Sequence, residues 1–245
     1  MAASLSTRSG LALLLLSLLI GCREKPSPGA ACNTNNLAAC FDPAQAALCR
    51  SGQWASIPCR GPQGCVEHGN AHNVTCDDSR ASVGDACMNG NIGSYACSAD
   101  GKRALVCNRD KFESWRNCRG AGGCHIEGSV VECDNSIAES GDACGPPGSL
   151  ACGTDHRSLL LCQDGHMKSA SSCRGPKECA VKPDKRGVSC DTTIASEGDS
   201  CELPEARACS PDAKLELVCK GKKFVRLHEC TGTGCVVRDG RVICQ

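Results

Sequence analysis

The chain has 245 residues, of which 25 are cysteine, and it carries 27 basic and 27 acidic side chains. This cysteine content indicates a disulfide-rich or metal-loaded protein, and two Trp, one Tyr and three Phe are too few aromatic residues for one large core. A formal net charge of zero argues against nucleic acid as a partner, since nucleic-acid binding requires a basic face.

The first segment, residues 1–21, predicts an export signal. Arg8 gives it a basic head, and the apolar run over residues 11–20 is too short to span a bilayer as a helix. The run ends in Leu19-Ile20-Gly21-Cys22, which resembles the lipobox of bacterial lipoprotein signal peptides. The resemblance implies cleavage before Cys22 and a diacylglycerol thioether and an N-acyl chain of the palmitate type on Cys22, which together give a stable anchor. An ordinary secretory signal with a chance cysteine is the alternative.

The residues after Cys22 predict where the chain is delivered. In lipoproteins of well-studied bacteria, an Asp after the lipidated cysteine retains the protein in the inner membrane. Here that residue is Arg23, so the resemblance implies the bacterial outer membrane, with the face of the membrane left open. Residues 22–31 contain two prolines and read as a short tether.

The other 24 cysteines form four sets of six, and the first cysteines of successive sets are 55, 57 and 57 residues apart. Ala precedes the second cysteine of every set, and Gly follows the fourth by two residues. We therefore predict four tandem repeats, residues 32–82, 83–139, 140–196 and 197–245. The cysteines are Cys32, Cys40, Cys49, Cys59, Cys65 and Cys76; Cys87, Cys97, Cys107, Cys118, Cys124 and Cys133; Cys144, Cys152, Cys162, Cys173, Cys179 and Cys190; and Cys201, Cys209, Cys219, Cys230, Cys235 and Cys244.

Disulfide bonds are the predicted use of these cysteines. A unit of this length buries too little surface to be secure alone, and three disulfides would each contribute roughly 2–4 kcal/mol. Zinc sites usually take their cysteines as C-x₂₋₄-C pairs. No CxxC occurs in this sequence, and the closest cysteines, such as Cys230 and Cys235, have four or five residues between them. We expect all 24 cysteines to bond within their own repeats.

Each repeat predicts a small β-meander followed by a β-hairpin. Residues 215–219 alternate with a strand period, and a two-residue turn at Gly221-Lys222 places Cys219 opposite Phe224. The same frame pairs the third cysteine with the largest apolar residue of each repeat, which we assign to its core. These residues are Trp54, Phe112, Met167 and Phe224. The fold class is a small disulfide-rich all-β array of four similar modules, without a large core and without a helix after residue 22.

The second hairpin predicts one disulfide pairing. A turn at Asp239-Gly240 places Cys235 opposite Cys244 as a non-hydrogen-bonded pair, with Cα atoms about 4.5 Å apart. This separation allows a disulfide, so we expect the fifth and sixth cysteines of each repeat to bond. The alternative is that both sulfurs share a face and bond elsewhere. The other two bonds stay open.

The junctions between repeats have constant length. Ten residues separate the sixth cysteine of one repeat from the first of the next, while loops inside the repeats vary. We therefore expect packed junctions, a semi-rigid rod, and Asp side chains that accept backbone hydrogen bonds in turns. A calcium ion shared between repeats is the alternative, although two carboxylates are few ligands for it. Each junction begins with Asp and ends with Gly-Asp: Asp77 and Asp85, Asp134 and Asp142, Asp191 and Asp199, whereas Ala30 and Gln245 stand at the outer ends.

The sequence predicts no enzyme, metal or cofactor site. A thiol oxidoreductase needs a CxxC motif on a helix, and the histidines occupy unrelated positions in the repeats, as expected for solvated loops. They are His68, His72, His125, His156, His166 and His228. The Cys-Arg-Gly loops after the fourth cysteines have two interpretations, a backbone nest for an anion or a tight linker in which Gly supplies unusual dihedrals.

Two resemblances bear on function. The segment Cys230–Cys244 resembles part of the invertebrate-type chitin-binding modules, which are also six-cysteine β units and stack exposed aromatic rings on sugars. Because the few rings here are assigned to cores, we expect no binding to insoluble chitin, cellulose or peptidoglycan, and sugar binding is kept as the alternative.

As a class, the lipobox with its cysteine-rich repeats resembles outer-membrane lipoproteins of the myxobacterial type. The resemblance implies a non-enzymatic, lipid-anchored envelope protein that acts as a stalk or a protein-interaction surface. The implied partners are the membrane, through the anchor, and other envelope or surface proteins. We expect no nucleic acid and identify no small-molecule substrate.

Overall fold

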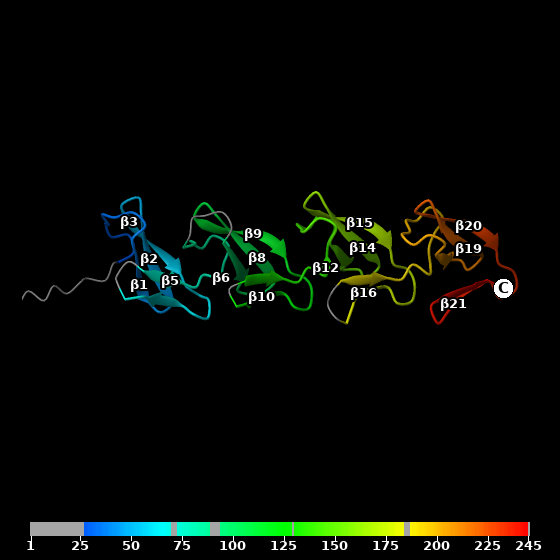
Figure 1. Ribbon diagram of the computed structural model, residues 1–245, viewed down its shortest axis with the longest axis horizontal. Coiled ribbons are helices and arrows are strands. Elements are labelled where there is room, and N and C mark those ends of the chain that lie inside the picture. Colours follow the sequence, from blue (N-terminus) through cyan, green and yellow to red (C-terminus); the bar gives the residue numbers. More distant parts are fainter. Residues whose placement is uncertain (1–26, 70–72, 89–93, 129, 184–186, 245) are drawn as a thin grey trace, which may run out of the picture.

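The computed structural model describes residues 27–69, 73–88, 94–128, 130–183 and 187–244. Within these ranges the chain is all-β, and four small modules follow one another in a row along the long axis (Figure 1). The described residues include no helix that is long and apolar enough to cross a membrane. Cys22, the signal segment and His72 lie outside the described residues.

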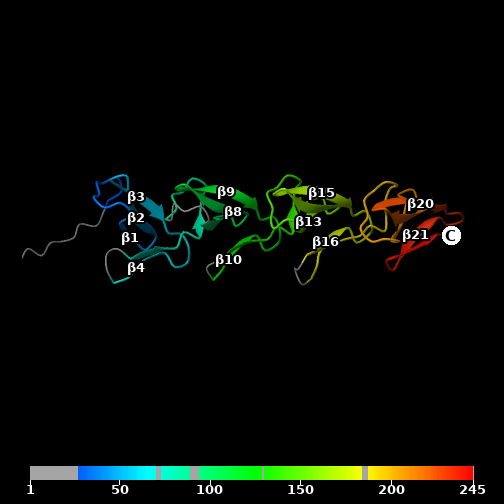
Figure 2. The ribbon, with the colours of Figure 1, turned by 45° about the horizontal axis from the view of Figure 1, so that its top comes forward.

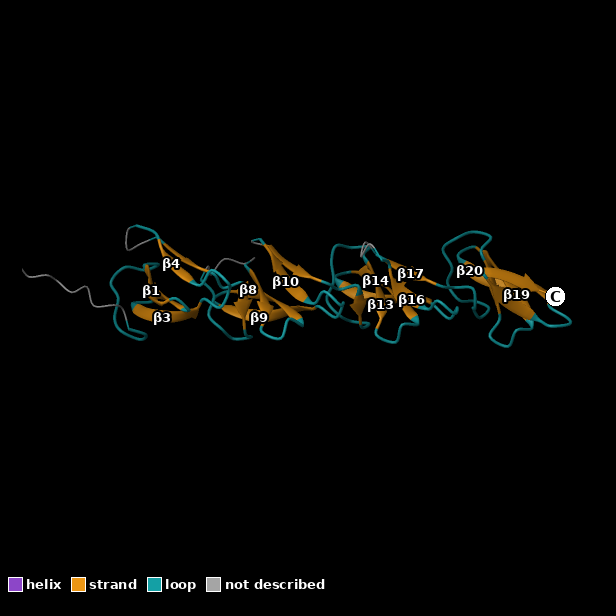
Figure 3. Ribbon diagram, turned by 90° about the horizontal axis from the view of Figure 1, so that it is seen from below, coloured by secondary structure: helices purple, strands orange, loops and turns teal. Residues whose placement is uncertain are grey.

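The first sheet of each module is an antiparallel meander (Figure 3). A short strand from the preceding junction joins it in modules two and three (Figure 1). Its strands are β1 (Ala38–Asp42), β2 (Gln45–Arg50) and β3 (Gln53–Pro58) in module one; β6 (Arg80–Ala81), β7 (Tyr95–Ser98), β8 (Arg103–Asn108) and β9 (Lys111–Asn117) in module two; β12 (Ile137–Ala138), β13 (Leu150–Gly153), β14 (Ser158–Gln163) and β15 (His166–Ser172) in module three; and β18 (Arg207–Cys209), β19 (Leu215–Lys220) and β20 (Lys223–Glu229) in module four.

The second sheet of each module is a two-stranded hairpin that shares no strand with the meander. The hairpins lie along one side of the row and the meanders along the other (Figures 1 and 2). The strands are β4 (Cys65–Glu67) and β5 (Val74–Cys76); β10 (Cys124–Glu127) and β11 (Val130–Cys133); β16 (Cys179–Val181) and β17 (Val188–Cys190); and β21 (Cys235–Arg238) and β22 (Arg241–Cys244).

The predicted registers are confirmed. Cys219 pairs with Phe224 across the β19–β20 turn, where Gly221 and Lys222 have φ angles of 58° and 62°, as a type I′ turn requires. The third cysteine faces the predicted residue in the other modules too, and the fifth faces the sixth in every hairpin.

The assigned core residues are confirmed in three modules and not in the first. Phe112, Met167 and Phe224 are each 1% exposed, whereas Trp54 is only half-buried. In modules two to four an Ala from the preceding junction completes the core around the large residue. Among the described residues of module one no such Ala joins the cluster, and Ile57 is the largest fully buried side chain there.

The junction segment packs with the module that follows it. β6 and β12 pair in parallel with β7 and β13, and an isolated parallel bridge joins Ile194 to Cys209. Ala81, Ala138 and Ala195 are 2–3% exposed and lie in the cores of the next modules. The structural boundaries therefore fall before these segments, earlier than the sequence divisions after residues 82, 139 and 196.

Twelve disulfides lie within the four modules, but the predicted fifth–sixth bond is wrong. The first cysteine bonds to the third, the second to the fifth and the fourth to the sixth, as in Cys87–Cys107, Cys97–Cys124 and Cys118–Cys133, and the pattern is the same in all modules. The alternative is confirmed: the two opposed cysteines share one face of the hairpin, as directly opposed residues of an antiparallel pair do, and their sulfurs bond elsewhere. Two bonds instead join it to the meander, with which it shares no strand.

This connectivity predicts the outcome of paired cysteine substitutions. Replacing Cys97 and Cys124 together by Ala removes one bond, lowers the free energy of unfolding by about 3 kcal/mol and leaves no free thiol in the repeats. Replacing Cys124 and Cys133 breaks two bonds and exposes two thiols. Thiol titration of the denatured, unlipidated chain separates the cases, and the opposite counts would contradict the second–fifth and fourth–sixth pairing.

Candidate functional site at the repeat junctions

An Arg–Asp ion pair crosses each of the three junctions. The Arg follows the fourth cysteine of one module, and the Asp belongs to the Gly-Asp turn that opens the next. The Arg119 Nε lies 3.0 Å from the Asp142 Oδ2. Each pair therefore links residues of two different modules across the junction. The three pairs are Arg60–Asp85, Arg119–Asp142 and Arg174–Asp199.

Neither outer end of the array carries its half of the pair. Module four has Thr231 where the other modules have Arg, and the turn that opens module one has Ala30 where the others have Asp. The turn itself is retained, because Gly29 and Ala30 exchange backbone hydrogen bonds with Trp54 as Gly84 and Asp85 do with Phe112. The charges are thus present only where a neighbour supplies the partner.

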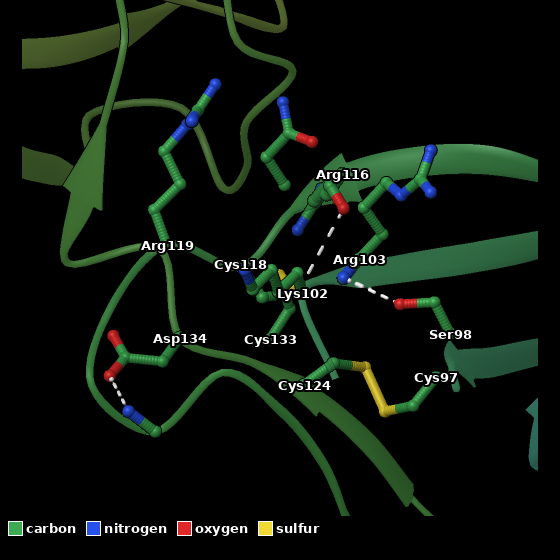
Figure 4. Close-up of a disulfide and its surroundings, with 12 residues drawn as sticks. Cys97, Ser98, Lys102, Arg103, Arg116, Cys118, Arg119, Cys124, Cys133 and Asp134 are labelled. Atoms are coloured by element: carbon green, nitrogen blue, oxygen red, sulfur yellow. Dashed lines mark hydrogen bonds between the residues drawn. A yellow bond between two sulfur atoms is a disulfide. The ribbon is translucent and has the colours of Figure 1, made fainter. Parts of the chain in front are cut away.

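The first Asp of each junction fixes the Cys-Arg-Gly loop of its own module. In module two the Asp134 Oδ2 accepts a hydrogen bond from the Gly122 N–H at 2.9 Å (Figure 4), and the Oδ1 accepts one from the Ser136 N–H at 3.0 Å. Asp77 and Asp191 do the same at their junctions. The predicted role of the junction Asp residues in turns is confirmed.

The Cys-Arg-Gly loop matches neither of its two predicted interpretations fully. Its N–H groups do bind an anion, as in a nest, but the anion is the carboxylate of the chain's own junction Asp. A Cβ on Gly120 would lie 2.1 Å from Asp134 carboxylate atoms, and Gly61 and Gly175 have the same relation to Asp77 and Asp191. These three glycines are therefore required for space, since their φ angles are not in the left-handed region.

Hydrogen bonding keeps three of the junction carboxylates, those of Asp77, Asp142 and Asp191, charged. Burial raises the pKa of Asp142, but hydrogen bonds from Arg119, the Glu139 N–H and Asn117 outweigh it, so that the pKa lies below its ordinary value. Burial likewise opposes ionisation of Asp77 and Asp191, and hydrogen bonds with the hydroxyl and N–H of Ser79 or Thr193 lead the groups that lower their pKa values. A charged carboxylate is what both the loop and the ion pair need.

Module two contains a basic hollow of about 780 Å³ between the loop at residues 100–103 and the loop at residues 117–124. Its charged lining residues are Lys102, Arg103, Arg119 and Asp100. Figure 4 shows the three basic residues in the neighbourhood of the Cys97–Cys124 bond. Backbone N–H groups of the second loop, such as those of Gly123 and Cys124, are already bonded to carbonyls. The hollow therefore offers side-chain charge but few backbone donors.

A second groove, of about 580 Å³, lies between modules one and two. It combines polar side chains from both modules with apolar side chains from module two. The residues that line it are Gln63, Thr75, Cys76, Asp77, Asp78, Ser79, Ser94, Tyr95, Trp115, Ile126, Gly128, Val130 and Val131.

Two aromatic rings stack in this groove. The ring centroids of Tyr95 and Trp115 are 4.5 Å apart and tilted by 34°, and the Arg116 guanidinium carbon lies 3.7 Å from the centre of the indole. Trp115 is the extra residue of a β-bulge, since Ala104 pairs with Arg116 and Leu105 with Ser114. A bulge re-aims a side chain, and the Trp115 ring is partly buried, packed against a cluster of buried residues in module two.

The position of Tyr95, two residues before the second cysteine, varies between modules. It holds Ala38 in module one, Leu150 in module three and Arg207 in module four. The groove at the next junction has a volume of about 410 Å³ and contains Leu150 and Asn135 in place of Tyr95 and Asp78. The modules thus share a framework and differ in the side chains that line the junctions.

Module four buries a carboxylate at a position where the other three modules have an apolar side chain. Glu216 is 3% exposed and lies 2.6 Å from Arg207 and 2.8 Å from His228. Its position, three residues before the third cysteine, holds Ala or Leu elsewhere. The nearby Cys244 is bonded to Cys230, so this cluster offers no thiolate. A second cluster, His125, Glu127 and Glu132, lies exposed on one hairpin.

Comparison with protein-family models, with curated proteins and with solved structures finds no match to this chain. The functional argument therefore rests on the geometry of the junctions.

The six predicted junction Asp residues all lie at the junctions, and three of them have ion-pair partners that the sequence analysis missed. The sequence contains a signal for these partners, which are Arg60, Arg119 and Arg174. The Arg of the Cys-Arg-Gly motif is missing only in the last repeat, and the Asp of the Gly-Asp turn is missing only before the first repeat. The predicted lipidation residue, Cys22, lies outside the described residues.

The lowered pKa values predict that acid weakens the junctions. A carboxyl whose pKa is depressed by folding stabilises the fold above its unfolded-state pKa of about 3.9, and the contribution is lost as the pH falls through the folded-state value. Asp142→Asn should flatten the fall in unfolding free energy between about pH 5 and pH 2. Asp239→Asn, at an exposed hairpin turn, is the matched control. Identical pH profiles for Asp142→Asn and the unchanged chain would contradict the assignment.

Proposed function

We propose that the protein is a non-enzymatic, lipid-anchored spacer of the bacterial outer membrane, whose modules form a stalk that presents interaction surfaces away from the membrane. The observation that carries the proposal is the repeated Arg–Asp pair across the junctions, accompanied by a junction segment that packs into the core of the next module. A flexible tether would need neither.

The construction of the junctions supports a rod rather than a flexible string of modules. Each junction contains two connections between modules, the Arg–Asp pair and a segment that runs from one module into the core of the next. At the first junction, Arg50 also lies 3.2 Å from Asp110 and donates to the Cys87 carbonyl at 2.8 Å. Motion at a junction would break several of these contacts at once.

Removing the ion pairs should bend or loosen the rod. One partly exposed salt bridge is worth only about 0–1 kcal/mol, so the informative variant changes all three Arg residues, Arg60, Arg119 and Arg174, to Glu. Small-angle scattering of the unlipidated chain should then show a broader distribution of distances and a shorter mean length. Arg238→Glu with Arg241→Glu, on the last hairpin, should leave the curve unchanged. An unaltered curve for the triple variant would exclude the pairs as the source of rigidity.

Cys22→Ser should release the protein from membranes. Because the lipid is attached through the Cys22 sulfur, the variant cannot be acylated there and should move from the outer-membrane fraction to the soluble envelope fraction. Metabolic labelling with a palmitate analogue should mark the unchanged chain only. Cys87→Ser, with Cys107→Ser to avoid an unpaired thiol, is the control for loss of a cysteine elsewhere. Labelling that persists in Cys22→Ser would refute lipidation at this residue.

A further inference from the structure

The groove between modules one and two has the features of a saccharide site, and we propose that it binds a single neutral oligosaccharide chain, with Tyr95 as the platform for one sugar ring. This goes beyond the spacer role, because it assigns a ligand class to one junction.

The aromatic stack holds Tyr95 in place. Planar groups centred 3.7 Å and 4.5 Å from the indole centre would collide on one face of it, so Arg116 and Tyr95 cover opposite faces of Trp115. Tyr95 is the outer member of the stack and remains 40% exposed. A ring fixed in this way loses little freedom when a ligand packs on it. A pyranose has one face of C–H groups, which suits the electron-rich face of such a ring.

Polar side chains that can hydrogen-bond to sugar hydroxyls line the same groove as Tyr95. Ser94 is adjacent to Tyr95 in sequence, and Gln63, Thr75 and Asp78 line the same groove. Asp78 Oδ2 accepts a hydrogen bond from the Met88 N–H at 3.0 Å, which orients its carboxyl group. Hydroxyl groups that donate to a carboxylate form charge-assisted bonds. Two adjacent carboxyl groups, those of Asp77 and Asp78, disfavour an anionic glycan, so the ligand class is neutral.

The size and number of rings indicate one chain rather than a polymer surface. A volume of about 580 Å³ lies in the range of small-molecule sites. Packing on an insoluble polymer would require a flat strip of exposed rings, and the described residues provide this stack at one junction only. The expectation that insoluble chitin, cellulose and peptidoglycan are not bound is therefore unchanged, while a short soluble chain is a different ligand.

The chain itself supplies the substitutions for a test. Tyr95→Leu and Asp78→Asn install the residues that modules three and two carry at the equivalent positions, Leu150 and Asn135, so both should preserve the fold. Leu150→Ala, one junction further, is the matched control. The probes are triacetylchitotriose and cellotriose, with trigalacturonate as the anionic comparison, and the signal is the fluorescence of Trp115 in a Trp54→Phe background.

We expect a saturable change in Trp115 emission with at least one neutral trisaccharide and none with trigalacturonate. Tyr95→Leu should weaken binding by about tenfold or more, Asp78→Asn should weaken it several-fold, and Leu150→Ala should have no effect. Absence of a signal with both neutral probes at millimolar concentration, or equal binding by Tyr95→Leu, would overturn the proposal. Scattering of the same samples tests the rod separately, since neither substitution removes a junction ion pair.

Discussion

The disulfides between hairpin and meander are the constraint on which the rest of the molecule depends. The two sheets of a module share no strand, and the bonds from the second to the fifth and from the fourth to the sixth cysteine are the covalent links between them. These bonds also fix both ends of the loop that contains Cys-Arg-Gly. The Arg in that loop is thereby directed at the next module. The first junction Asp fixes the loop by accepting a hydrogen bond from one of its N–H groups. Covalent order inside a module is converted in this way into order between modules.

The array separates a constant framework from variable surfaces. Cysteines, junction Asp residues and loop glycines recur because each has a geometric task, whereas the residue two positions before the second cysteine changes from Ala to Tyr, Leu and Arg. That position borders a junction groove in modules two and three. A repeat protein of this kind acquires a new surface by changing a few side chains, without altering the core or the sulfur bonds.

Much of the fold was predictable because the cysteine spacing and the turn residues leave few choices. The registers of Cys219 with Phe224 and of Cys235 with Cys244 follow from two-residue turns. The disulfide partners did not follow, because register says which sulfurs oppose each other and not which way they point relative to a second sheet. The aromatic stack was missed for a related reason. The frame that places Phe112 in the core does not indicate that a bulge changes the direction of the Trp115 side chain, so that its ring stacks with Tyr95. The junction arginines were visible as a motif, but their partners lie more than twenty residues away and in another module.

The unmatched ends described above have a consequence for assembly. The contact between modules is head-to-tail, and head-to-tail contacts between identical units build open filaments unless something closes or stops them. With Thr231 at one end and Ala30 at the other, two copies that met end to end would form no Arg–Asp pair. The Arg–Asp contact therefore forms three times between modules of one chain, and Ala30 and Thr231 do not offer it to a second copy.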